Sequence, residues 1–117
     1  MAYMLLIMED PAQRDTRTRA EGEEVFQRMV DFSEVLKRED KLIAVESLAS
    51  QKQAARVQVR GGKSQVLDGP FAEAKEMIGG FFLLKCHTRE EALAIAQRCP
   101  AAEWATVEVR ETAPCYR

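Results

Sequence analysis

The hexapeptide Tyr-Met-Leu-Leu-Ile-Met at residues 3–8 decides the fold. It is a short, continuous apolar run, and the polar sequence Glu9-Asp10-Pro11 closes it. Such a run suits a strand buried on both faces better than a strand with one face in water. We therefore expect a sheet whose two faces both need a cover.

Helical and strand-like patterns alternate along the rest of the chain. Apolar residues recur at spacings of three and four between about residues 21 and 39, which predicts a helix with one apolar stripe. Thr88 and Glu91 form a capping-box pattern that predicts a second helix, running to Cys99 and stopped by Pro100. Strands are predicted at residues 3–8, 42–48, 55–60, 63–67, 81–86 and 106–110.

Two further signals are turns. Gly61 and Gly62 separate two strand-like runs, and because both glycines can adopt positive φ they predict a two-residue hairpin. Asp68 can cap a short helical turn that Pro70 would open, and we expect that turn to end near Gly79.

The order strand, helix, two or three strands, helix, strand predicts one α+β domain over residues 1–117. It matches the split βαβ pattern of a ferredoxin-like sandwich, an antiparallel sheet with both helices on one face. The other face would then expose apolar side chains, which usually marks an interface. A second copy packed face to face would cover it, which predicts a homodimer, a dimeric α/β barrel.

Composition narrows the function classes. The net charge of −2 argues against nucleic acid as a partner, because phosphate binding needs a basic face. The longest apolar run is far shorter than the roughly 20 residues of a membrane span, so we expect a cytoplasmic chain with no membrane partner. Cys86, Cys99 and Cys115 are widely spaced, and we expect reduced thiols and no metal site. No motif for a large cofactor is visible, so we expect no cofactor.

Residues 68–76, Asp-Gly-Pro-Phe-Ala-Glu-Ala-Lys-Glu, followed by Gly80-Phe81-Phe82, resemble the signature of the DGPF-containing branch of the YciI-like (YCII-related) proteins. The opening residues 3–6 and the final strand, residues 107–110, are similar to that family as well, so the resemblance covers nearly the whole chain. It implies a ferredoxin-like fold, a dimeric α/β barrel and a cleft flanked by polar residues. It also implies a largely uncharacterised function, with some relatives encoded beside, or fused to, extracytoplasmic-function sigma factors.

One departure from the family bears on chemistry. Relatives proposed as enzymes carry a His on the first helix facing an Asp, whereas residues 21–39 here contain no His, so that acid–base pair cannot be assembled. His87, the single histidine, is expected to be an exposed loop residue. Asp68 has two interpretations, a helix cap that fixes the turn or a catalytic carboxylate that transfers a proton.

Other residues are candidates for ligand binding. Glu46 interrupts an apolar strand, so its carboxylate must reach water or be paired, and Arg56 is its expected partner. Together with Asp68 they would give a cavity its polar lining. The neighbouring residues Pro70, Phe71 and Lys75 complete the predicted ligand-binding set, with Lys75 a cation for an anionic ligand and Phe71 either a plug or a ligand platform.

Two functions remain open at this point. The first is a homodimeric barrel that binds an unknown, anionic small molecule, or a cofactor-independent enzyme using acid–base chemistry at Asp68. The second is a non-catalytic regulatory or protein-interaction module, linked to sigma-factor-dependent transcription by the family resemblance.

Overall fold

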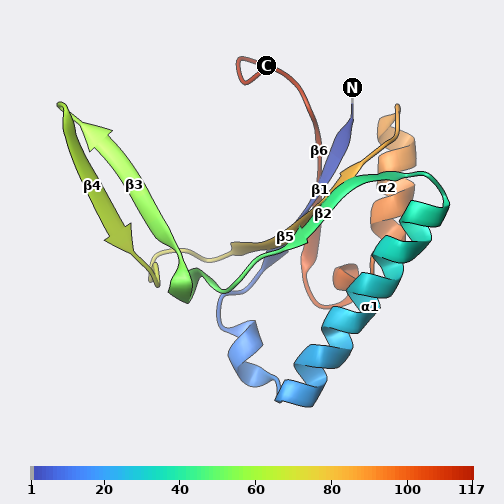
Figure 1. The fold of residues 1–117 in the computed structure, drawn as a ribbon, viewed down its shortest axis with the longest axis horizontal. Coiled ribbons are helices and arrows are strands. Elements are labelled where there is room, and N and C mark those ends of the chain that lie inside the picture. The colour runs from blue at the N-terminus through green and yellow to red at the C-terminus, as the bar shows by residue number, and fades with distance from the viewer. Residues whose placement is uncertain (1) are drawn as a thin grey trace.

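The computed structural model describes residues 2–117 and has an α+β fold (Figure 1). Within that range are two α-helices, α1 (Arg19–Arg38) and α2 (Arg89–Arg98). The strands are β1 (Tyr3–Glu9), β2 (Leu42–Ser47), β3 (Ala55–Arg60), β4 (Lys63–Asp68), β5 (Met77–Leu84) and β6 (Thr106–Glu111). Short 3₁₀ helices lie at η1 (Gln13–Thr16), η2 (Gln51–Gln53) and η3 (Pro100–Glu103).

Four strands form the main sheet, in the order β2-β5-β1-β6 with all neighbours antiparallel. Without the β3–β4 pair, the chain runs β-α-β-β-α-β, and its two central strands are the first and third of that series. This is the ferredoxin-like arrangement that the element order predicts, with both helices on the same face (Figure 1).

β1 presents different residues to the two faces of the sheet because side chains alternate along a strand. Tyr3, Leu5, Ile7 and Glu9 are buried on the helix-covered face. The residues between them, 4, 6 and 8, are only half-buried on the face that carries no helix. The prediction that this strand is buried on both faces is therefore correct for one face within a single chain.

The core lies between the helices and the sheet. It contains Phe32 and Leu36 of α1, and Phe32 packs edge-on against Phe82 of β5 with ring centroids 5.5 Å apart. α2 contributes Ala92 and Ile95 to the same cluster. Phe32 and Leu36 lie in the C-terminal half of α1. The N-terminal half of that helix contributes no residue to this buried cluster.

Each helix begins at a threonine. The hydroxyl of Thr18 accepts the Glu21 N–H at 3.1 Å, and the Glu21 carboxylate accepts the Thr18 N–H at 2.9 Å, so α1 has a complete capping box that our sequence analysis did not identify. Thr88 accepts the Glu91 N–H at 3.2 Å, as predicted. The Glu91 carboxylate forms an ion pair with Lys41, and this pair lowers the pKa of Glu91.

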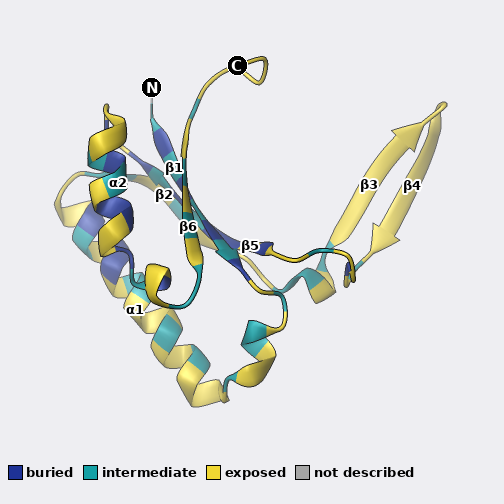
Figure 2. Ribbon diagram, turned by 180° about the vertical axis from the view of Figure 1, so that it is seen from behind, coloured by how far each residue is buried: buried dark blue, intermediate teal, exposed yellow. Residues whose placement is uncertain are grey.

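β3 and β4 form a separate two-stranded hairpin that extends away from the main sheet (Figure 1). Gly61 and Gly62 have φ of 58° and 75°, so the predicted turn is confirmed. The hairpin has two unlike faces: its register places Ala55, Val57, Val59, Ser64 and Val66 on one face and mainly polar or basic residues on the other. Both faces are exposed in the single chain (Figure 2).

The segment after β4 corrects one prediction. Asp68 is the last residue of β4 and caps no helix, and the helical turn expected to end near Gly79 is replaced by non-helical turns before β5 begins at Met77. A side chain at Gly69 would overlap the carbonyl oxygen of Gln51, so the backbone itself packs on η2. Phe71 is buried and lines a hollow at the root of the hairpin, so the plug and the ligand platform both stay predictions.

No helix within residues 2–117 has the length and apolar character needed to cross a membrane. The three cysteines are free thiols: Cys86 and Cys99 are buried, and Cys115 is exposed. Burial raises the pKa of the Cys86 and Cys99 thiols.

Candidate functional site

A cavity of about 760 Å³ lies between the N-terminal half of α1 and the main sheet. It forms because this half of the helix packs less closely than the half that carries Phe32 and Leu36, and because Gly79 and Gly80 provide no side chains on the sheet side. Its apolar wall contains Val25, Phe26, Met29, Val30, Phe82 and Trp104. Phe26 is 54% exposed, so a large ring faces this space without a full cover.

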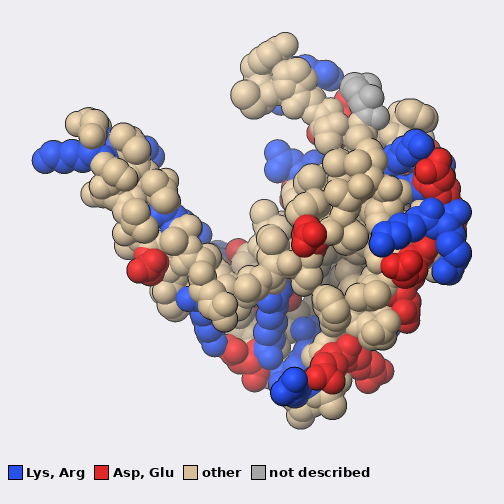
Figure 3. Space-filling model, in the orientation of Figure 1, with Lys and Arg blue, Asp and Glu red and all other residues tan. Residues whose placement is uncertain are grey.

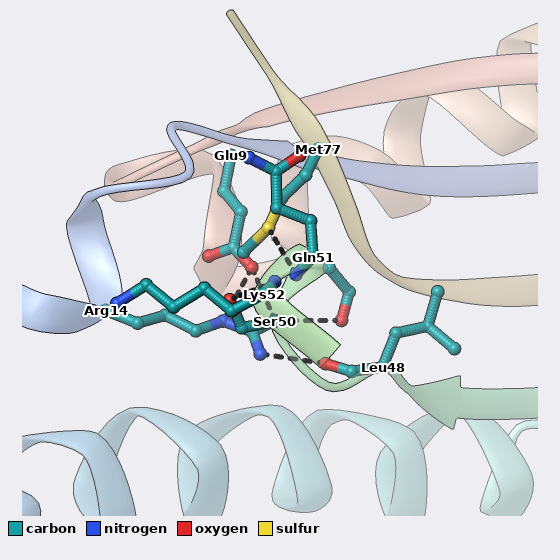
Figure 4. Close-up of polar contacts among 8 residues, drawn as sticks. Glu9, Arg14, Leu48, Ser50, Gln51, Lys52 and Met77 are labelled. Atoms are coloured by element: carbon teal, nitrogen blue, oxygen red, sulfur yellow. Dashed lines mark hydrogen bonds and ion pairs between the residues drawn. The ribbon is translucent and has the colours of Figure 1, made fainter. Parts of the chain in front are cut away.

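Glu9 is the buried acidic residue of the cavity lining. It ends β1 on the helix-covered face and is only 6% exposed. Its Oε1 accepts hydrogen bonds from Arg14, from Nε at 2.9 Å and from Nη2 at 2.5 Å (Figure 4). An unpaired carboxylate would be costly at this depth, so the guanidinium of Arg14 is what allows a charge here.

Arg14 also connects three parts of the chain. Its Nη1 donates to the carbonyl oxygen of Leu48 at 2.8 Å (Figure 4). Its Nη2 lies 3.4 Å from the carbonyl oxygen of Gly79. One side chain thus joins η1 to the ends of β1, β2 and β5. Gly79 leaves the necessary room, because a Cβ there would overlap Oε1 of Glu9.

The second carboxylate oxygen of Glu9 has a different environment. Both bonds from Arg14 end on Oε1, and no donor of residues 2–117 hydrogen-bonds Oε2. Glu9 lines the cavity, and Oε2 is not among the fully enclosed side-chain atoms that lack a partner. An acceptor oxygen therefore remains available to a molecule inside the cavity.

Arg17 and Trp104 stand at one side of the cavity. The guanidinium of Arg17 lies 5.9 Å from the centre of the Trp104 ring, and that of Arg28 lies 5.3 Å from it, both within cation–π range. Arg28 is paired with Glu103, whose pKa is lowered by that contact. Arg17 forms no ion pair with any residue in the described part of the chain, so its charge is available.

The structure divides the predicted site residues among separate places. Glu46 lines the cavity beside α1. Arg56 and Phe71 line a second hollow of about 590 Å³ at the root of the hairpin, with Met77 and the η2 residues. Asp68, Pro70 and Lys75 are exposed and line neither space.

The expected pairing of Arg56 with Glu46 is wrong. Arg56 lies on the hairpin and not on a neighbouring strand of the main sheet, and its Nη1 donates to Glu73 at 3.0 Å. Its guanidinium also lies 3.7 Å from the centre of the Phe71 ring. Glu46 is exposed instead of buried, so it needs no partner. The DGPF segment thus builds the root of the hairpin, and Asp68 makes no side-chain hydrogen bond to the described residues.

Sequence reasoning missed Glu9, Arg14 and Arg17 as a group. One signal was present: Glu9 has the same parity as Tyr3, Leu5 and Ile7, so strand alternation places it on the helix-covered face. An acidic residue there requires a partner, and a basic segment follows it within a few residues. Elsewhere, no group of three or more His, Cys, Asp or Glu side chains within residues 2–117 is arranged to hold a metal ion.

Comparison with known proteins agrees with this fold. The model of the YCII-related domain matches residues 1–115. An uncharacterised protein of Rhizobium meliloti (strain 1021) is similar to this chain, with 32% identity over 97 residues, which are 83% of this chain and 78% of the relative. The match spans nearly the whole chain, and it includes both Glu9 and the segment at the root of the hairpin. The chain therefore belongs to the family of YCII-related domain proteins.

Proposed function

We propose that this chain is a small-molecule-binding member of the YCII-related family and that its ligand occupies the cavity between α1 and the sheet. The observation that carries the proposal is Glu9, a carboxylate almost fully buried in an apolar cavity with one oxygen that no donor of residues 2–117 hydrogen-bonds. Ligand sites commonly combine an apolar wall with a few fixed polar groups. The ion pair with Arg14 fixes Glu9 before any ligand arrives.

A carboxylate in this position can accept a hydrogen bond or a proton from a bound molecule. That is the acid–base chemistry we expected of Asp68, at a different residue. Asp68 itself lies at the end of β4, outside both hollows. A catalytic role for Asp68 stays a prediction, and so does the regulatory alternative linked to sigma factors.

The test uses Gly22, where an added Cβ meets open space and which lines the cavity. Gly22→Trp would fill the cavity, whereas Gly22→Ala would leave it open. We would screen small carboxylates, phenols and lactones by thermal shift against wild type, both Gly22 variants and Asp68→Asn. Hits lost only in Gly22→Trp support the cavity. Hits lost in Asp68→Asn but kept in Gly22→Trp would restore Asp68 as the site, and no hit at all would contradict ligand binding.

We also propose that the functional unit is a homodimer. Val57, Val59 and Val66, on one face of the hairpin, are 65%, 58% and 65% exposed. An isolated two-stranded hairpin is marginally stable in water, so this arm needs a surface to pack on. The helix-free face of the sheet offers one, since Met4, Leu6 and Leu83 are apolar and only half-buried there.

A second copy fits this surface best because one chain carries both an exposed apolar hairpin face and a half-buried apolar sheet face. The hairpin carries Arg56, Arg60 and Lys63 and no acidic residue before Asp68, and Figure 3 shows basic side chains at its outer end. The helix-free face carries Glu46, Glu108 and Arg110, in register with Phe81, Leu6 and Met4, and Glu108 lies 3.7 Å from Arg110. Two copies related by a two-fold axis would each place the valine face of its hairpin on the apolar sheet face of the other and leave the basic side chains on the outer hairpin face.

A further inference from the structure

We propose that the ligand of the α1 cavity is a monoanionic amphiphile, with its acid group at Arg17 and a neutral hydrogen-bond donor at Glu9. This inference rests on the proposed function, because it names the class of molecule that the same cavity takes. The charged residues that line the cavity differ in whether another group of the protein already pairs with them.

The charged residues that line the cavity are three arginines, Glu9 and Glu46, and the side chain of Glu46 lies on the helix-free face of the sheet. Arg14 is engaged with Glu9 and with two backbone carbonyl oxygens, and Arg19 is paired with Glu23 at 2.9 Å. Arg17 has no such partner within residues 2–117 and lies half-buried beside Trp104. It is therefore the cation of this lining that a ligand can use.

Glu21, an acidic residue close enough to sense the charge of Arg17, already accepts a hydrogen bond from the helix cap. The Glu21 carboxylate accepts the Thr18 N–H, and that hydrogen bond is the main reason that the pKa of Glu21 is lowered, with Arg17 a smaller cause. The stacking of Arg17 on Trp104 restricts the guanidinium to the side of the cavity. An acid group there would gain charge-assisted hydrogen bonds, which are stronger than neutral ones.

The β2 wall of the cavity offers no cation to the acid group. Val45, Glu46 and Ser47 line it from that strand, and the strand register places the Glu46 side chain on the helix-free face. The acid group is therefore directed to the α1 side. Phe26, Met29 and Phe82 line the same cavity and require an apolar body.

The inner end of the cavity selects a donor. Oε2 of Glu9 can only accept a hydrogen bond while the carboxylate is ionised. A ligand that placed an apolar group there would leave this acceptor without a partner, and such mismatches are rejected strongly. A hydroxyl or amide N–H on the ligand, separate from its acid group, satisfies it.

The experiment is isothermal titration calorimetry of the full chain with three matched probes. They are 3-(4-hydroxyphenyl)propanoate, its primary amide, which lacks the charge, and 3-phenylpropanoate, which lacks the donor. We expect wild type to bind the first probe about tenfold more tightly than either of the others. Arg17→Gln should remove the advantage of the acid over the amide. Arg19→Gln, which removes the same charge two residues away, should change it less than about twofold.

The donor end needs a variant that still folds. Glu9→Met combined with Arg14→Met replaces the whole buried pair with apolar side chains of similar size, a change that is often tolerated. It should abolish the preference for the hydroxylated probe and keep the preference for the acid. If the double variant does not fold, the wild-type comparison of the two propanoates still decides the point.

The outcomes separate this inference from the function on which it rests. If wild type binds the acid and the amide equally, and Gly22→Trp weakens the binding of both equally, the ligand class is overturned and the cavity remains the binding site. Equal effects of Arg17→Gln and Arg19→Gln would overturn the role of Arg17. Failure of wild type to bind any of the three probes would overturn the ligand class proposed here, while the wider screen still tests the cavity.

Discussion

Glu9 and Arg14 meet through a single oxygen: Nε and Nη2 of Arg14 lie 2.9 Å and 2.5 Å from Oε1 of Glu9. The more common fork arrangement uses both carboxylate oxygens. Here the second oxygen is left for the cavity, while the charge of Glu9 is still balanced. The pair can therefore support the fold and present an acceptor at the same time.

Breaking this pair from the arginine side should be costly. Arg14→Met leaves the Glu9 carboxylate buried without a partner, and we expect the free energy of unfolding to fall by about 2–3 kcal/mol, since Arg14 is partly exposed. Urea denaturation measures the change. Lys52→Met is the matched control, because it breaks the exposed Lys52–Asp15 pair and should cost less than about 1 kcal/mol. Equal losses in both variants would contradict a structural role for the Glu9–Arg14 pair.

Two glycines should respond to alanine in opposite directions. At Gly79 a methyl group overlaps Oε1 of Glu9, so Gly79→Ala must displace the ion pair and should destabilise the protein by about 1–3 kcal/mol. Gly22 lies inside α1 with open space around it, so Gly22→Ala should stabilise by about 0.5–1 kcal/mol. Thermal unfolding of both variants measures the difference, and a neutral Gly79→Ala would show that Glu9 can move aside.

The apolar face of the hairpin should control assembly. Val59→Lys places a charge on that face, and we expect it to shift the protein from dimer to monomer in light-scattering chromatography. Gln58→Lys puts the same charge on the opposite, polar face of the same strand and should leave the dimer intact. A wild-type monomer would refute the dimer outright. Equal dissociation by both lysines would show that net charge, and not the apolar face, is responsible.

Acid should weaken the contact between α2 and the end of α1. Hydrogen bonds from Arg98 to Glu39, at 3.0 and 2.9 Å, lower the pKa of that carboxyl below its ordinary value of 4.5. A lowered folded-state pKa gives stability that is present above pH 4.5 and lost as the pH falls through the lowered value. Glu39→Gln should therefore flatten the decline of stability at acid pH, measured by urea unfolding. Glu24→Gln, an exposed carboxylate with no ion pair to the described residues, is the control and should leave that decline unchanged.

Much of the fold could be predicted from the sequence because its signals are local. The spacing of apolar residues places both helices, and Gly61 and Gly62 place a hairpin with the positive φ values that the structure has. Where that hairpin packs is not a local property. The β3–β4 pair forms its own sheet, with η2 and the buried Phe71 at its root, and this separation is not visible in the strand pattern.

The site was harder to predict for a related reason. Asp68, Pro70 and Phe71 form a conspicuous motif, yet their segment packs against backbone, where Gly69 approaches Gln51, and builds the hairpin root. In the sequence, Glu9 has the form of an ordinary polar residue that ends an apolar strand. Its importance depends on which face of β1 the helices cover and on how far the Arg14 side chain reaches, and both are properties of the folded chain.

The placement of Arg17 beside the capping box of α1 has a dynamic consequence. Arg17 directly precedes Thr18, the residue that caps α1. A molecule bound to the Arg17 guanidinium is therefore held close to the first turn of that helix. Terminal turns are ordinarily where a helix opens and exchanges its amide hydrogens fastest. Occupancy of the cavity would slow that opening, and the amide hydrogens of residues 19–22 would then exchange more slowly.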